Sequence, residues 1–116
     1  MQAPGEGRAA DPDEPASRSE ARDAATDSAL DVAARCAQVA TLAAEVARDG
    51  HAGVRHDAAA ALLLAASGAE CALSLAHENL RSAIETDRTR NTKRRIWRTR
   101  LLLRRAHPAG ETGDSE

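Results

Sequence analysis

Aromatic side chains are nearly absent from this chain of 116 residues, which has one Trp, no Phe and no Tyr. A core without large rings must be filled by Ala, Leu and Val. Such a core needs closely packed helices, because small side chains fill little volume. The sequence holds 28 alanines, and both Ala and Leu are strong helix formers. The composition therefore predicts an all-α fold.

Cysteine is also scarce, since only Cys36 and Cys71 occur, each inside an apolar helical pattern. They form no Cys-x-x-Cys pair. The N-terminal stretch MQAPGEGRAADPDEP lacks the apolar segment of a secretory signal. We expect both thiols to be reduced core residues, with a disulfide as the less favoured alternative, and the protein to be cytoplasmic.

Large apolar residues are missing from both ends of the chain. Residues 1–27 contain three of the four prolines and carry three arginines against seven acidic side chains, and residues 107–116 read HPAGETGDSE. Such segments cannot bury enough surface to offset the entropy lost on ordering. We therefore expect a disordered acidic tail over 1–27, a helical domain over 28–106 and a second disordered tail over 107–116.

The first predicted helix runs from Ser28 to Arg48. A stripe of apolar residues recurs at intervals of four and three, which is typical of the buried side of a helix. Its members are Val32, Cys36, Val39, Ala43 and Val46. Gly50 fits the left-handed conformation that commonly ends a helix.

The second predicted helix starts at Asp57, a good N-cap, and ends near Asn79-Leu80. Between residues 58 and 76 the only charge is Glu70, and small residues form a ridge: Ala61, Ala65, Ala69, Ala72 and Ala76. A helix that is apolar nearly all round belongs in the centre of a bundle. We therefore predict an antiparallel bundle around this Ala/Leu-rich helix.

A membrane span is the competing interpretation of the same segment. About 19 residues reach the minimal length of a span. However, Ala is nearly neutral for insertion, and Glu70 near the middle would cost on the order of a few kcal/mol. We therefore favour a buried helix of a soluble protein over a membrane helix.

The third predicted helix begins at Ser82, because Ser82 and Glu85 match a capping box, and runs to Arg105 before Pro108. From Arg88 to Arg105 it has nine basic residues and no acidic one. Nucleic-acid binding would fit this charge. A solvated basic face is the more common explanation, and residues 28–105 carry a net charge of only +5, so we disfavour a nucleic-acid partner.

Two flanking helices cannot cover a central helix that is apolar on every side. The missing neighbours must come from a second copy of the chain or from another polypeptide. Burial alone therefore predicts an oligomer or an assembly with a partner.

Several motifs, in order, resemble the cyclodeaminase/cyclohydrolase family. GHAGVRHD, from Gly50 to Asp57, resembles that family's G-N-x-x-x-R/V-S-D loop. An Ala/Leu-rich helix follows in both, and here it ends at Asn79-Leu80. The preceding stretch from Ala29 to Ala33, ALDVA, is similar to the family's Pro-Leu-x-Val-Ala. The resemblance covers residues 29 to 105.

The resemblance implies an all-helical, dimeric fold that acts on the bridge between N5 and N10 of tetrahydrofolate. It also shows departures. The family's Pro-Gly-Gly-Gly loop and acidic D-x-D-A segment have no counterpart in this sequence, and His51 and His56 stand where the family usually has Asn and Ser. The chain resembles the C-terminal half of the fold, which suggests that a partner supplies the missing half-domain.

The candidate site residues each have a structural alternative. Asp57 is an N-cap or part of a folate pocket, and His56 is a proton carrier or a solvated loop residue. Asn79 and Arg55 are candidates for substrate binding, although Asn79 also fits a polar helix end. Glu70 needs a partner within its apolar helix, which Arg55, Arg35 or a partner chain could supply. No metal-ligand pattern is visible, so we expect no metal.

These observations lead to two functional hypotheses. In the first, the chain is a cyclodeaminase/cyclohydrolase-like domain of folate one-carbon metabolism, incomplete as an enzyme by itself, with a tetrahydrofolate derivative as substrate and no bound cofactor. In the second, it is a non-catalytic helical module for oligomerisation or partner binding. Whether it is an enzyme stays open at this point.

Overall fold

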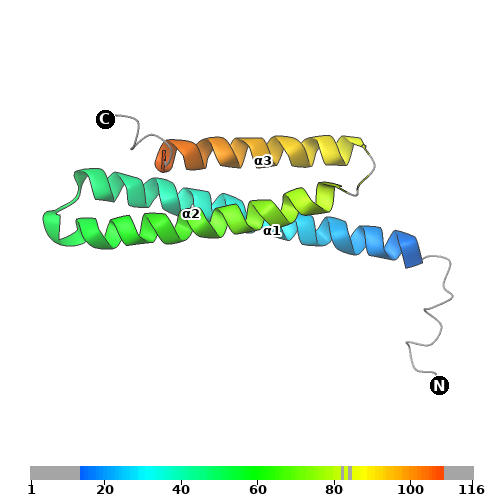
Figure 1. The fold of residues 1–116 in the computed structure, drawn as a ribbon, viewed down its shortest axis with the longest axis horizontal. Helices are drawn as coiled ribbons and strands as arrows, with labels where there is room; N and C mark the ends of the chain where they lie inside the picture. The colour runs from blue at the N-terminus through cyan, green and yellow to red at the C-terminus, as the bar shows by residue number, and fades with distance from the viewer. Residues whose placement is uncertain (1–13, 82, 84, 109–116) are drawn as a thin grey trace, which may run out of the picture.

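The computed structural model describes residues 14–81, 83 and 85–108, with side chains from Ser17 onward. It contains three helices and no strand within these residues: α1 from Glu14 to Asp49, α2 from Ala52 to Arg81, and α3 from Asp87 to Ala106. α1 and α2 form a long antiparallel hairpin, and α3 runs along one side of it (Figure 1). The predicted all-α fold is confirmed.

α1 begins at Glu14 rather than at Ser28, so the prediction of disorder was wrong for residues 14–27. Pro15 is tolerated because it lies in the first turn, where no intrahelical donor is needed. Farther along, Thr26 is buried, and Asp23 and Asp27 form ion pairs with Arg88 of α3. The tails over 1–13 and 109–116 lie outside the described residues.

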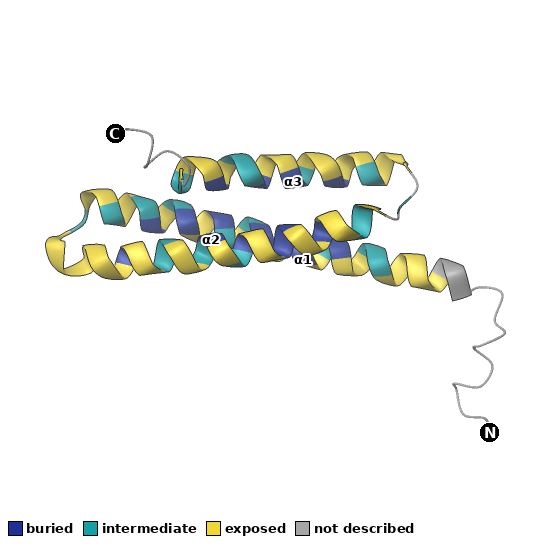
Figure 2. Ribbon diagram, in the orientation of Figure 1, coloured by how far each residue is buried: buried dark blue, intermediate teal, exposed yellow. Residues whose placement is uncertain are grey.

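The core is a contact between two alanine faces. On α1 the buried residues include Leu30, Ala33, Ala37 and Ala40, while the predicted residues Val32, Val39 and Val46 are 43–52% exposed. The core residues on α2 include Ala69, Ala72, Leu73 and Ala76. Small side chains let two helix axes approach closely, so alanine, and not valine, predominates on the face of α1 that packs on α2. Figure 2 shows the buried parts of both helices.

The predicted small-residue ridge of α2 is partly right. Ala69, Ala72 and Ala76 are buried, whereas Ala61 and Ala65 are half-buried. α2 is not covered all round in one chain, because Leu63, Leu64 and Leu75 are more than half exposed. Its mean hydropathy reaches 1.7 over 18 residues, so among the described helices it alone is long and apolar enough to cross a membrane. The core helix of a soluble protein can meet the same criteria of length and hydropathy.

α3 starts later than predicted. Its N-cap is Thr86, whose side chain accepts from the Thr89 amide while Thr89 accepts from the Thr86 amide, so these two residues form a capping box. Ser82, the predicted start of the box, lies outside the described residues. Glu85 instead receives a hydrogen bond from Lys93, 3.0 Å from Nζ to Oε1. This bond, with further help from Arg90, holds the pKa of the Glu85 carboxyl below its ordinary value. The small stabilisation is therefore present near neutral pH and is lost as the carboxyl is protonated in acid.

Ion pairs attach α3 to α1. Arg88 contacts Asp23 and Asp27 at 3.2 and 2.7 Å, and Arg95 contacts Asp27 and Asp31 at 3.5 and 3.1 Å. Ile96 and Leu103 reach the core beneath these pairs. The arginines in the first half of α3 therefore position the helix on the hairpin.

The turn between α1 and α2 is closed at Gly50, although not in the predicted way. No described glycine has a positive φ. The Gly50 amide donates to the Val46 carbonyl at 2.7 Å, and a Cβ at Gly50 would lie 2.6 Å from that oxygen. Glycine is needed here because the Val46 carbonyl leaves no room for a Cβ. A left-handed backbone conformation is not the reason.

We expect Gly50→Ala to lower the free energy of unfolding by about 1–3 kcal/mol, because the new methyl group must displace backbone. Gly53→Ala is the matched control, since open space surrounds that position, and it should gain up to about 1 kcal/mol from helix propensity. Urea denaturation followed by circular dichroism measures both. Equal effects of the two substitutions would contradict this account of the turn.

Candidate functional site

The first group of candidate residues lies at the start of α2. The helix begins five residues before Asp57, and the carbonyl of His51 accepts from the Val54 and Arg55 amides at 3.0 and 3.1 Å. The prediction that Asp57 is the N-cap was therefore wrong. Asp57 is an exposed residue of the second turn. The helix start was predicted too late because Gly53 is typical of a loop. The first turn of a helix nevertheless tolerates a glycine, and α2 begins at Ala52.

Arg55, one of the partners considered for Glu70, contacts the α1–α2 turn instead. Its Nε donates to the Gly50 carbonyl at 2.7 Å and so helps to close the α1–α2 turn. His51 and His56 are both exposed beside it. The described residues contain no group of three His, Cys, Asp or Glu side chains placed to hold a metal ion.

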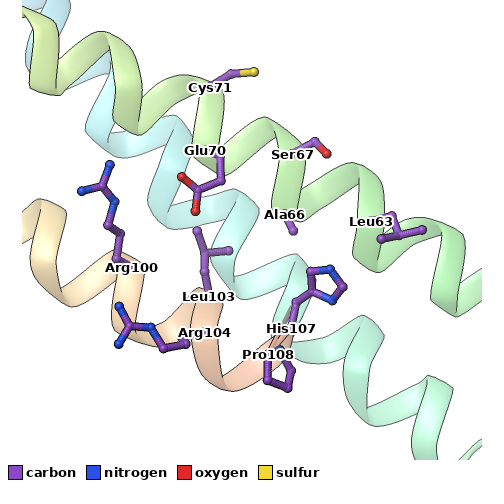
Figure 3. A pocket seen from close by; sticks show the side chains of 10 residues that line it. All are labelled: Leu63, Ala66, Ser67, Glu70, Cys71, Arg100, Leu103, Arg104, His107 and Pro108. Atoms are coloured by element: carbon purple, nitrogen blue, oxygen red, sulfur yellow. The ribbon is translucent and has the colours of Figure 1, made fainter. Parts of the chain in front are cut away.

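Glu70 lies in the middle of α2 and points toward α3 (Figure 3). It is exposed, so it does not need the buried partner that the sequence suggested. It lines a pocket of about 730 Å³ together with Leu63, Leu103, Arg100 and Arg104. Both cysteines are free, Cys36 half-buried and Cys71 exposed.

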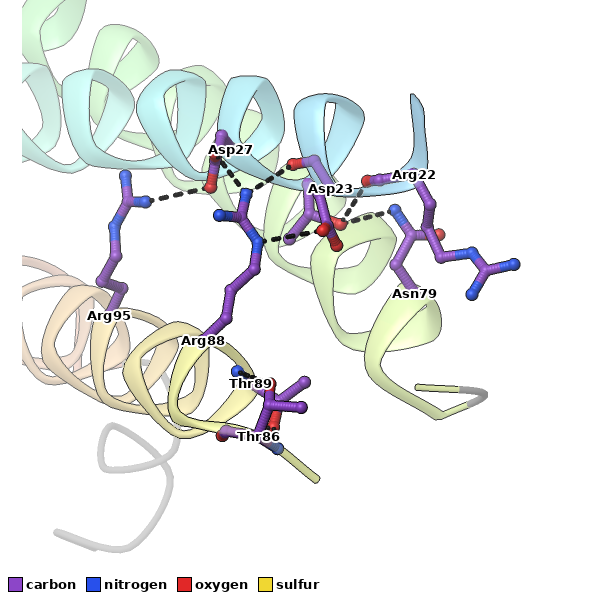
Figure 4. Close-up of polar contacts among 9 residues, drawn as sticks. Arg22, Asp23, Asp27, Asn79, Thr86, Arg88, Thr89 and Arg95 are labelled. Atoms are coloured by element: carbon purple, nitrogen blue, oxygen red, sulfur yellow. Dashed lines mark hydrogen bonds and ion pairs between the residues drawn. The ribbon is translucent and has the colours of Figure 1, made fainter. Parts of the chain in front are cut away.

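The second group of candidates lies at the other end of α2. Asn79 is half-buried, and its Nδ2 donates to Thr26 Oγ1 at 2.8 Å (Figure 4). The Thr26 hydroxyl in turn donates to the Arg22 carbonyl at 2.9 Å. Sequence reasoning missed Thr26 because it fell within the segment predicted to be disordered.

Around Asn79 the three helices enclose a polar pocket of about 390 Å³. Arg22 and Asp23 of α1 and Arg88 and Thr92 of α3 contribute to its walls. The acids at positions 23, 27 and 31 recur every four residues on α1, which was the sequence signal for a charged side facing the basic helix.

The two groups do not meet within one chain. Asp57 and Asn79 are 22 positions apart on one unbroken helix, which corresponds to about 33 Å at a rise of 1.5 Å per residue. His56 and Arg55 lie at the far end with Asp57. A single chain thus has two separate candidate regions and no joint site.

The geometry defines an all-helical protein with an alanine-packed hairpin and functional candidates at both ends of its apolar helix. A family model described as formiminotransferase-cyclodeaminase matches residues 3–98 of the chain. The match covers most of the sequence, so the chain belongs to the formiminotransferase-cyclodeaminase family. No curated protein and no solved structure gives a significant match.

We expect Thr26→Val to lower the free energy of unfolding by about 1 kcal/mol, because the half-buried Asn79 amide loses its acceptor. Thr41→Val is the control, since the Thr41 hydroxyl only donates to the Ala37 carbonyl of its own helix. Thermal denaturation compares the two. An equal shift in Tm would show that the contact between α1 and Asn79 contributes nothing beyond local helix effects.

Proposed function

We propose that this chain is a cyclodeaminase/cyclohydrolase-like unit of folate one-carbon metabolism that functions only within an assembly. The observation that carries the proposal is the position of Asp57 and Asn79 at opposite ends of an incompletely covered helix. A second polypeptide against this helix would supply both the missing cover and the missing part of a site.

An apolar surface, here called the uncovered face, supports this proposal. Its members are Val32, Val39, Leu42 and Val46 of α1 with Leu64 and Leu75 of α2, all of them exposed. α3 covers the side of α1 that carries Asp27 and Asp31, and helical spacing puts the valines on a different side. Large contiguous apolar surfaces mark association sites in soluble proteins.

The spacing along α2 favours a second copy in antiparallel orientation. Asp57, Leu64, Gly68, Leu75 and Asn79 follow one another at alternating intervals of seven and four residues, so they lie on one side of the helix. Asp57 and Asn79 are both eleven residues from Gly68. A two-fold axis near Gly68 would therefore bring Asp57 of one copy level with Asn79 of the other along the paired helices.

Such a pairing would bring together the groups that hydrolysis of a methenyl or formimino bridge needs. A carboxylate or imidazole, Asp57 or His56, would move the proton of the attacking water. The Asn79 amide would orient the pterin. We propose that the glycine-rich and acidic segments of the family, which this sequence does not contain, would have to come from a further chain before turnover occurs.

The alternative is a non-catalytic helical module. The hydrogen bond between Asn79 and Thr26 favours it, because it already uses one donor of the amide for structure. In this case the uncovered face would serve association alone. The alternative predicts the same assembly without folate binding.

We expect the chain to sediment as a dimer or larger species, and Val39→Glu to shift it toward the monomer mass of 12.2 kDa. The substituted carboxylate would be buried in the interface without a partner. Gln38→Glu introduces the same charge at the neighbouring exposed position and should leave the mass unchanged. A compact wild-type monomer would refute the assembly, and loss of association in both variants would refute the assignment of the face.

Turnover is expected to be negligible for the chain alone, with at most weak folate binding that salt reduces, because only charge would attract the ligand's carboxylates. The decay of methenyltetrahydrofolate absorbance against a buffer blank measures turnover. Rapid turnover by the pure chain, abolished by Asp57→Ala in a variant that stays folded, would show that the chain is an enzyme by itself.

A further inference from the structure

The pocket between α2 and the second half of α3 is distinct from both candidate regions. Its apolar part comes from Leu63 and Ala66 of α2 and Leu103 of α3. Glu70 points into it from α2, and Arg100 extends toward it from α3 (Figure 3). Its volume of about 730 Å³ falls in the range of small-molecule sites.

The basic residues of α3 that line this pocket differ in their partners from four basic residues nearer its N-terminus. In the first half of the helix, Arg88, Arg90, Lys93 and Arg95 all form salt bridges with carboxylates. In the second half, Arg100 and Arg104 form no salt bridge with any described residue, and neither does Glu70 across the pocket. Arg94, Arg98 and Arg105 also form no salt bridge with a described residue, but they do not line this pocket.

The pocket also extends past the part of the chain that matches the family. The match ends at residue 98, whereas five lining residues follow it: Arg100, Leu103, Arg104, His107 and Pro108. Two guanidinium groups without a salt bridge to any described residue therefore lie beside an apolar surface, in a part of the chain that the family match does not include.

We propose that this pocket binds a small organic anion that carries a carboxylate or phosphate on an apolar body. Guanidinium groups bind both head groups with charge-assisted hydrogen bonds. Arg100 and Arg104 hold the head group, and Leu63, Ala66 and Leu103 contact the apolar body. Glu70 opposes a second negative charge, so it favours singly charged ligands over doubly charged ones.

Hexyl phosphate and heptanoate are suitable probes for the two head groups, with hexylammonium as the probe of opposite charge. Residue-resolved chemical shifts of the full-length chain should change saturably at Leu103 and Arg104 with at least one of the anions, and not with hexylammonium. Absence of saturable shifts with both anions would overturn the proposal.

Matched variants test the role of the two arginines. Arg100→Gln with Arg104→Gln should weaken the anion about tenfold or more, as expected for lost charge-assisted hydrogen bonds. Arg94→Gln with Arg98→Gln removes the same charge from residues that do not line the pocket, and it should change affinity less than about twofold, since exposed charges act weakly at a distance. If both double variants weakened anion binding equally, the loss would reflect the net charge of the chain and not contacts in the pocket. That result would overturn the proposed site.

Glu70→Gln gives an independent readout. It removes the opposing carboxylate, so hexyl phosphate should bind more tightly while heptanoate gains less. Weaker binding of hexyl phosphate by this variant would contradict the assigned role of Glu70. None of these measurements requires folate binding or assembly, so their failure would leave the proposed function untouched.

Discussion

The close approach of two alanine faces is the constraint on which the rest of this molecule depends. Ala33, Ala37 and Ala40 of α1 are fully buried against α2. A Cβ placed on Gly68 of α2 would lie 3.2 Å from the Cys36 sulfur, which shows how little space separates the helices. Because alanine fills most of this interface, Val32, Val39 and Val46 lie on a flank of the hairpin, while Leu30 and Leu73 are the largest fully buried side chains of the core.

The two flanks of the hairpin then differ in chemistry. On one flank, Asp23, Asp27 and Asp31 of α1 receive the arginines of α3, each exposed ion pair contributing at most about 1 kcal/mol. On the other flank, Val32, Val39 and Leu64 are 49–75% exposed in a single chain. A third helix attached through charge leaves the apolar flank exposed, so the residues that form the core within the chain differ from the apolar residues left at its surface.

The sequence was sufficient for the all-α class, the number of helices and the family, because composition and motif order are properties of long segments. It was insufficient for the start of α1, since the acids of residues 14–27 look like a solvated tail until α3 brings Arg88 against them. It also placed the buried side of α1 on the valines. Hydrophobic periodicity ranks valine above alanine, whereas close helix packing selects the smaller side chain.

For the candidate site too, the sequence identified residues but not their positions in space. Asp57, His56 and Asn79 are recognisable by motif, but a motif cannot tell how far apart its ends lie. One unbroken helix, beginning at Ala52 because its first turn accepts Gly53, holds Asp57 and Asn79 at its two ends. The separation is fixed by helical geometry, so no movement of side chains can join them within one chain. Any chemistry that uses both residues must therefore be a property of an assembly, while the pocket at Arg100 and Arg104 lies within a single chain and does not share this requirement.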